Sequence, residues 1–237
     1  MAEFLDKSGN IFVTDADTLT ITVNCEGVMG AGIALDARLR WPAMFDAYRE
    51  RSERGEMRPG TLMLWEPSDS QTRHRVLCFP TKNRWRAPSR LDYIRLGLDA
   101  VAHLHKEARI STIAMPHLGC SHGGLRWSDV RPLIVEALGP CEGLRVEMWD
   151  FNPRADDPWY DELERLLDGR SRDEIKELLG ITSRQVTSLV EAMDNPRIRG
   201  LASLQAAPGV GEKTLGAVYA LVFHREEDPP HQAQLPW

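Results

Sequence analysis

Two glycine-rich turns, each between a predicted strand and a predicted helix, constrain the fold of this chain more than any other feature. The first turn covers residues 27–32 and follows the β-branched run at residues 20–23. The second covers residues 119–124 and follows the apolar run at residues 110–115. Strand–turn–helix units of this kind are typical of α/β proteins, in which strands and helices alternate along the chain.

The same alternation continues to about residue 150. Apolar and β-branched runs predict short strands at residues 11–13, 20–23, 61–65, 75–79, 110–115 and 144–149. Helical spacing predicts helices at residues 33–54, with an interruption before Pro42, at residues 89–107 and at residues 128–138. Ser89 and Asp92 have capping-box spacing at the start of the second of these helices. The pattern predicts an α/β sandwich with a mixed sheet in residues 1–150.

Beyond residue 150 the sequence changes character. Residues 151–158 are polar and contain two prolines, as a linker does, and residues 159–237 are predicted to form a small all-α domain. Within it, residues 173–190 have helix-turn-helix spacing, with Gly180 at the turn and Val186 packing back from the second helix.

Composition excludes several classes of protein. An apolar content of 42% in 237 residues supplies a core, which disordered and fibrous chains lack. No apolar run is long enough to span a bilayer, and residues 1–7 carry acids where a signal peptide carries bases, so we expect a cytoplasmic protein without membrane contact. The cysteines lie far apart without metal-ligand spacing, which predicts neither a disulfide framework nor a metal site: Cys25, Cys78, Cys120 and Cys141.

Charge is distributed unevenly along the chain. Residues 1–150 hold 19 basic and 20 acidic side chains, and residues 151–237 hold 10 and 15, within a net charge of −6. Between Arg73 and Arg95 seven bases face one acid, Asp92: Arg73, Arg75, Lys82, Arg84, Arg86, Arg90 and Arg95. Such a run either binds a phosphate-bearing ligand or forms a solvated surface.

Individual residues in these segments have both a functional and a structural interpretation. The glycine turns either let a diphosphate approach the backbone or supply positive φ angles. Lys82 is either a surface cation or, with a pKa lowered by neighbouring cations, a nucleophile or base, which arginine cannot be. Asn24 either holds a sugar hydroxyl or caps its turn. Trp85 either stacks on a nucleobase or packs against the sheet.

Three blocks of sequence carry a family resemblance: residues 23–34, 79–90 and 116–127. Together they resemble a macrodomain, in particular the DNA ADP-ribosyl glycohydrolase antitoxin branch, with the terminal ADP-ribose protein glycohydrolases as the second-best match. The resemblance covers about residues 8–150 and implies a three-layer sandwich that binds ADP-ribose.

The resemblance also implies roles for residues. Asn24 would orient the distal ribose, and Lys82 would attack or assist at its anomeric carbon. The glycine loops would hold the diphosphate and the distal ribose, and Asn10 and Ile11 would meet the adenine. The implied ADP-ribose-binding residues are Asn10, Ile11, Val23, Gly30, Gly32, Ile33, Thr81, Leu118, Gly119, Cys120, Ser121, His122 and Gly123.

The chain departs from the family pattern at two positions. An acid is usual where this chain has Asn10, so the contact with the adenine amino group is expected to differ. The protein-directed relatives carry a catalytic aspartate where this chain has Gly123, and its absence favours the DNA-directed branch.

We therefore expect a hydrolase that removes ADP-ribose from a nucleobase in DNA without a metal or cofactor. Its implied partners are ADP-ribosylated DNA and a cognate DNA ADP-ribosyltransferase toxin. Two alternatives share most of the binding residues: hydrolysis of ADP-ribose esters on protein carboxylates, and an ADP-ribose reader or toxin-binding protein that does not depend on Lys82.

Two segments are candidates for DNA contact. The first is Arg84, Trp85 and Arg86, which follow the predicted lysine. The second lies in residues 201–223, which resemble a helix-hairpin-helix whose hairpin amides grip a DNA phosphate, through Gly209, Gly211 and Lys213. A helical bundle without DNA contact is the alternative, because residues 151–237 as a whole have a net charge of −5.

Overall fold

The fold is described here from a computed structural model, which describes residues 1–67 and 74–224. Arg73 of the basic run and residues 225–237 of the predicted helical domain lie outside the described residues.

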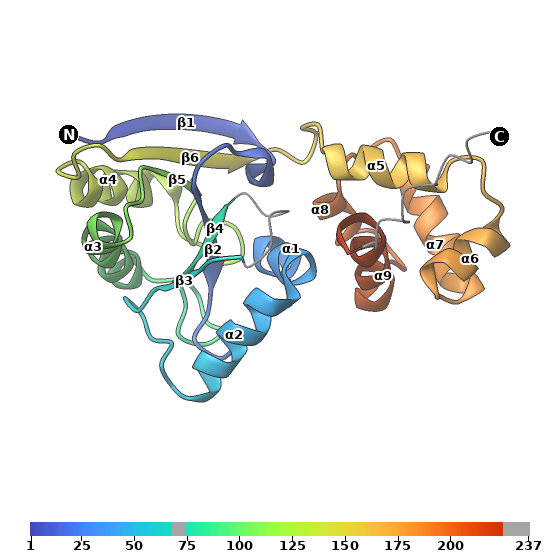
Figure 1. The fold of residues 1–237 in the computed structure, drawn as a ribbon, viewed down its shortest axis with the longest axis horizontal. Coiled ribbons are helices and arrows are strands. Elements are labelled where there is room, and N and C mark those ends of the chain that lie inside the picture. Colours follow the sequence, from blue (N-terminus) through green and yellow to red (C-terminus); the bar gives the residue numbers. More distant parts are fainter. Residues whose placement is uncertain (68–73, 225–237) are drawn as a thin grey trace, which may run out of the picture.

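A mixed six-stranded sheet forms the centre of the first 151 residues (Figure 1). Its strands are β1 (Glu3–Gly9), β2 (Thr18–Val23), β3 (Met63–Trp65), β4 (Arg75–Pro80), β5 (Thr112–Pro116) and β6 (Arg145–Phe151). Their spatial order is β1-β6-β5-β2-β4-β3. All neighbouring pairs are parallel except β3 and β4, so the predicted mixed sheet is confirmed.

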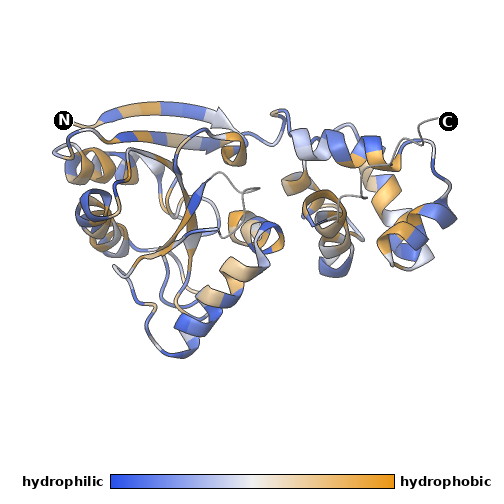
Figure 2. Ribbon diagram, in the orientation of Figure 1, coloured by the Kyte–Doolittle hydropathy of each residue, from blue (hydrophilic) through white to orange (hydrophobic). Residues whose placement is uncertain are grey.

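Helices cover both faces of this sheet. The helices are α1 (Gly32–Arg40), α2 (Pro42–Glu53), α3 (Leu91–Glu107) and α4 (Trp127–Leu138). Alternate residues of β4 point to opposite faces: Leu77 and Phe79 join the core under α3 and α4, and Val76 and Cys78 join the core under α1 and α2. The apolar sides of these helices face the sheet (Figure 2). The expected three-layer sandwich is confirmed.

The described chain beyond β6 is helical. It forms α5 (Pro158–Leu167), α6 (Arg172–Leu179), α7 (Ser183–Met193), α8 (Leu201–Leu204) and α9 (Glu212–Phe223). Gly180 ends α6 in the left-handed conformation at φ +60°, and Val186 is fully buried, as the helix-turn-helix spacing predicts. No helix in the two described stretches has the length and apolar character needed to cross a membrane.

The helical region packs against α1 (Figure 1). Leu35 of α1 belongs to the apolar core of helices α5–α9, and Arg38 pairs with Glu212 of α9 at 2.8 Å. Arg40, only 4% exposed, pairs with Asp36 at 2.5 Å. The division at residues 1–150, 151–158 and 159–237 stays a prediction, because α1 contributes to both cores.

Two local predictions are wrong, and one strand was not predicted. Residues 11–13 form a 3₁₀ helix, η1 (Ile11–Val13), and not a strand, because the Asn10 side chain accepts a hydrogen bond from the Phe12 backbone N–H and starts a turn. Strand β1 precedes it and lacks a clear apolar alternation, as is usual at a sheet edge. Ser89 does not cap α3, whose N-cap residue is Arg90.

Candidate functional site

The candidate site lies where three neighbouring parallel strands end. β5, β2 and β4 are adjacent, and they lead directly into His117, Asn24 and Thr81. Parallel strands bring their carboxyl ends to one edge of the sheet, and in open α/β sheets ligands bind at that edge. The two glycine turns and the segment containing Lys82 are thereby brought together, as the sequence predicts.

Asn24 organises the first glycine turn. Its side-chain Oδ1 accepts hydrogen bonds from the backbone N–H groups of Glu26 (2.9 Å) and Val28 (3.4 Å), and its Nδ2 donates to the Val28 carbonyl (2.6 Å). Tyr48 donates its hydroxyl hydrogen to the Asn24 carbonyl at 2.8 Å. The capping interpretation is therefore confirmed. One hydrogen of the amide nitrogen is left to donate, so the ribose role stays a prediction.

The first turn leads into a helix with open backbone amides. α1 begins after Ala31, which supplies no side-chain cap, and its first turn contains no acid. Such an N-terminus presents N–H groups and a positive dipole end to an anion. Gly32 has a φ of +56°, which accounts for glycine there by conformation, whereas Gly30 has neither a positive φ nor a close neighbour.

The second turn is shaped by tight packing and leaves backbone amides free. A β-carbon on Gly123 would lie 2.2 Å from the Ser89 Oγ and 2.3 Å from the Gly119 carbonyl oxygen, so this position requires glycine. In the described part of the chain, the backbone N–H groups of Ser121, His122 and Gly123 donate no hydrogen bond within the protein. Consecutive free amides form a concave site for an anion.

The two turns face each other. The His122 ring lies 3.5 Å from the position that a β-carbon on Gly32 would occupy, and the Lys82 Nζ donates to the His122 carbonyl at 2.7 Å. Lys82 thus stands beside the free amides of the second turn and near the start of α1. The arrangement offers one amine and two sets of amides to a ligand with a diphosphate.

Burial lowers the pKa of Lys82 below its usual value. The cause differs from the expected one, because partial desolvation by the protein, and not crowding by other cations, disfavours the charged ammonium. The pKa values of two thiols near the site shift upward: burial raises the pKa of Cys25 and of Cys120 to about 11. At neutral pH these thiols stay protonated, which makes them poor nucleophiles.

Arg84, Trp85 and Arg86 form an exposed segment directly after Lys82. Trp85 is 47% exposed, so the packing interpretation of this residue is wrong, and the Arg86 guanidinium lies 4.5 Å from the centre of its ring. Glu26 in the first turn accepts a hydrogen bond from the Trp85 backbone N–H at 2.9 Å. The segment is tied to the first turn while its side chains face solvent.

The basic run does not form one patch. Arg75 begins β4, at the opposite end of the strand from Lys82, and is bound to Asp17 at 3.0 Å. Arg90 pairs with Asp92 at 2.6 Å, and Arg95 approaches Glu136 at 3.7 Å. Within the described residues, Arg84 and Arg86 are the arginines of the run without an ion pair. The positive surface at the site is narrower than the sequence predicted.

Several predicted binding residues are buried and offer a ligand only their backbone. Val23, Thr81 and Leu118 are at most 3% exposed. Asn10 and Ile11 follow β1, whose carboxyl end lies at the same sheet edge but two strands from β5. The Asn10 side-chain oxygen is engaged by Phe12, and Ile11 is buried, so their predicted contact with adenine stays a prediction.

Sequence reasoning missed three residues that support the site. Tyr48 holds Asn24, Glu26 holds the segment after Lys82, and Ser89 lies beneath the second turn, where its N–H donates to the Gly123 carbonyl at 3.0 Å. Each acts through contacts between segments far apart in the chain, which no local pattern reports.

The predicted DNA-contacting residues of the helical region lie at the start of α9. Gly209 has a φ of +78°, and a β-carbon there would lie 2.4 Å from the Ser188 Oγ, so the fold alone requires this glycine. Gly211 is the N-cap of α9 and has open space around it. Lys213 is exposed. α8 and α9 flank this segment, and both the helix-hairpin-helix resemblance and the binding to DNA stay predictions.

Comparisons of this chain with known proteins agree on one family. A Macro domain model matches residues 21–134. The DNA ADP-ribosyl glycohydrolase of Mycobacterium tuberculosis is 42% identical over 131 residues, which are 55% of this chain and 37% of that protein. A DNA ADP-ribosyl transferase-DNA ADP-ribosyl glycohydrolase fusion protein of Thermosipho africanus is 31% identical over 149 residues, 56% of this chain and 38% of that protein. The chain therefore spans well under half of these curated relatives.

A solved structure agrees with this match. The macrodomain of Mycobacterium tuberculosis DarG has a TM-score of 0.61 and 36% sequence identity to this chain. The match covers 63% of this chain and 98% of that structure.

Proposed function

We propose, on the premise that this chain belongs to the macrodomain family, that it is a hydrolase that removes ADP-ribose from nucleobases in DNA. Relatives of this chain are named as DNA ADP-ribosyl glycohydrolases, and the Macro domain model matches residues 21–134, which contain Asn24, Lys82 and the second turn. The observation that carries the proposal is the contact of Lys82 with the second turn: its Nζ donates to the carbonyl of His122, which lies among the three residues with free backbone amides.

The two sets of amides would bind the diphosphate. The uncapped start of α1 and the free N–H groups at residues 121–123 face each other, so the two phosphates would be held between them. The open space at Gly30 would let the ligand approach the backbone closely. The remaining hydrogen of the Asn24 amide would donate to a hydroxyl of the distal ribose and orient the sugar.

Lys82 would act on the anomeric carbon of that ribose. Its neutral amine would form a bond to the carbon while the bond to the base nitrogen breaks. The base would leave with the electron pair and take up the proton released by the amine. Water would then add to the carbon, and the lysine amine would leave with a proton. The lowered pKa of Lys82 supports this step, because it enlarges the neutral fraction at neutral pH.

Exposed residues beside Lys82 would select DNA. Arg84 and Arg86 have no ion pair among the described residues, and Trp85 is exposed. Their guanidinium groups would bind phosphates next to the modified nucleotide, and the indole would stack on a neighbouring base. The helical hairpin at Gly209, Gly211 and Lys213 would add a second contact with the DNA backbone.

A comparison of three substrates tests the proposal. The full chain is offered oligonucleotides that carry ADP-ribose on a thymidine base or on a guanosine base, and a protein that carries ADP-ribose on glutamate. We expect release of ADP-ribose from at least one oligonucleotide to be faster than release from the protein by about 100-fold or more.

Each other outcome favours a different function. Faster release from the glutamyl protein would indicate the ester hydrolase. Tight binding of ADP-ribose without release from any of the three substrates would indicate a reader.

We further propose that the protein counteracts a DNA ADP-ribosyltransferase. The name of the Thermosipho africanus relative joins the transferase and the glycohydrolase in one protein, so the two activities are physically associated there. We also propose that it acts in the compartment that holds the modified DNA. Coexpression with such a transferase would test the pairing, and unchanged levels of ADP-ribosylated DNA would contradict it.

A further inference from the structure

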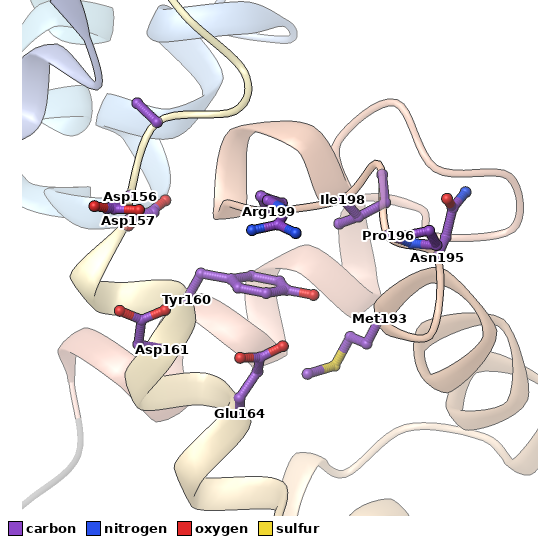
Figure 3. A pocket seen from close by; sticks show the side chains of 11 residues that line it. Asp156, Asp157, Tyr160, Asp161, Glu164, Met193, Asn195, Pro196, Ile198 and Arg199 are labelled. Atoms are coloured by element: carbon purple, nitrogen blue, oxygen red, sulfur yellow. The ribbon is translucent and has the colours of Figure 1, made fainter.

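A cavity lies in the helical region, away from the sheet edge. It has a volume of about 300 Å³ and opens between α5, the end of α7 and the segment that leads to α8 (Figure 3). Apolar side chains form part of its wall: Ala155, Met193, Pro196 and Ile198. The flexible thioether of Met193 suits a surface that adapts to an aliphatic chain.

Tyr160 presents an unused hydroxyl to this cavity. The residue is 3% exposed, its ring belongs to the core of helices α5–α9, and its hydroxyl points into the cavity (Figure 3). The hydroxyl oxygen is itself buried, and among the described residues it has no hydrogen-bond partner. A buried hydroxyl without a partner destabilises a fold, and phenylalanine would fill the same space without this cost. The tyrosine is therefore better explained by a ligand than by packing.

The cavity has an acidic rim. Asp156, Asp161 and Glu164 are exposed and form no ion pair within the part of the chain that the structure describes. The fourth acid, Asp157, is occupied, because it accepts hydrogen bonds from the backbone N–H groups of Trp159 and Leu201. Arg199 is the base in the lining and stands across the cavity from Asp161 and Glu164 (Figure 3).

The electrostatics of Tyr160 agree with this rim. Burial, with the charges of Glu164 and Asp194, raises the pKa of Tyr160 to about 12. At neutral pH the hydroxyl is therefore neutral, and it lies in a negative potential. A phosphate of a nucleic acid would be repelled here, whereas a cation would be attracted.

We propose that this cavity binds a lysine or arginine side chain presented by a basic segment of a partner protein. The methylene groups of that side chain lie along Met193 and Ile198, and its cationic end lies between Asp161 and Glu164. The cation displaces the side chains that cover the Tyr160 hydroxyl oxygen and donates a hydrogen bond to it. Arg199 donates to a backbone carbonyl of the segment. This site is independent of the proposed hydrolase activity.

The first test uses two labelled peptides and the full chain at low salt. One peptide alternates arginine with glycine, and the other alternates glutamate with glycine. Fluorescence anisotropy is expected to show saturable binding of the arginine peptide and none of the glutamate peptide. Equal binding of both peptides, or binding of neither, would overturn the proposal.

The second test locates the binding. Asp161→Asn with Glu164→Gln removes two rim charges and is expected to lower the affinity for the arginine peptide by about tenfold. Asp99→Asn with Glu142→Gln removes the same charge from exposed positions outside the cavity lining and should change the affinity less than about twofold. Equal weakening in both double variants would show attraction to net charge only and would reject the site.

The third test separates ligand binding from packing. Tyr160→Phe keeps the ring and removes the unpartnered hydroxyl, so the melting temperature should be unchanged or higher. Binding of the arginine peptide should fall by about fivefold. An unchanged affinity in this variant would contradict the role of the hydroxyl, and a lower melting temperature would show that it supports the fold.

Discussion

Two cations organise two different regions of the molecule. Arg40, at the end of α1, is 4% exposed, pairs with Asp36, and lies 4.2 Å from the ring centres of both Phe12 and Trp159. Lys82, at the sheet edge, has no ion pair within the described residues and donates to a carbonyl. The arginine is surrounded by partners from several segments, whereas the lysine keeps one contact.

The difference separates stabilisation from reactivity. A buried guanidinium is always charged, so it requires an acid and aromatic faces, and those contacts join η1, α1, α5 and α9. An amine without a neutralising acid can lose its proton, which a nucleophile requires. The predictions below separate these two roles in order of decreasing effect.

Removing Arg40 should have the largest effect, and it should act on stability. Arg40→Ala leaves Asp36 buried without its partner, so we expect the free energy of unfolding to fall by about 3–5 kcal/mol in chemical denaturation. Arg38→Ala is the matched control on the same helix. Its partner Glu212 is 71% exposed, and the expected loss is below about 1 kcal/mol. Equal losses would show that the burial of Arg40 is unimportant.

Removing Lys82 should affect catalysis alone. Lys82→Ala is expected to slow the release of ADP-ribose from modified DNA by about 100-fold or more, because a nucleophile stabilises the transition state. Lys82→Arg should be similarly slow, since a guanidinium keeps its proton. Calorimetry should show ADP-ribose affinity within about tenfold of the original. Normal turnover in the alanine variant would contradict the mechanism and favour a reader.

Substitutions in the exposed segment after Lys82 should weaken the binding of DNA and leave the binding of free ADP-ribose unchanged. Replacing Arg84, Trp85 and Arg86 with alanine should lower the affinity for modified oligonucleotides by about tenfold and make that binding less dependent on salt. The affinity for free ADP-ribose should not change. Arg51→Ala with Arg54→Ala removes two arginines at the end of α2, one in its last turn and one at its C-cap, as a charge control. Weaker binding of free ADP-ribose by the triple variant would mean that the segment supports the site itself.

The smallest effect is expected at the hairpin before α9. Gly211→Asp places an acid at an open helix N-terminus, so binding of unmodified duplex in a mobility shift should weaken by about threefold. Gly216→Asp adds the same charge in the interior of α9, where a β-carbon also has open space, and serves as control. Gly209 is unsuitable because its substitution would strain the contact with Ser188. An unchanged shift with Gly211→Asp would reject DNA contact at the hairpin.

Local sequence patterns predicted the features that depend on neighbours in the chain. The glycine turns, the break before Pro42 and the turn at Gly180 all follow from backbone preferences and apolar spacing. Residues 11–13 were mistaken for a strand because β-branched and aromatic residues suit both a strand and the short turn that Asn10 starts. The Asn10 side chain accepts a hydrogen bond from the Phe12 backbone N–H, and this contact favours the turn over the strand.

Features that depend on distant residues could not be predicted in this way. The binding of Arg75 to Asp17 removes it from the basic run, and Ser89 lies under Gly123 and does not cap a helix. The aromatic surroundings of Arg40 come from η1, α5 and α9, which approach each other only in the folded chain. The proposed role of Lys82 rests on the family resemblance, because spacing alone left it open.

The surroundings of Arg40 restrict how this chain can evolve. The guanidinium and its acid lie in α1, but the Trp159 and Phe223 rings that cover it belong to α5 and α9. Recombination that replaced the helical region with an unrelated sequence would leave that pair facing a foreign surface. Homologues that retain this helical region should therefore inherit residues 36, 40, 159 and 223 as a unit, and those with a different extension should have lost the arginine.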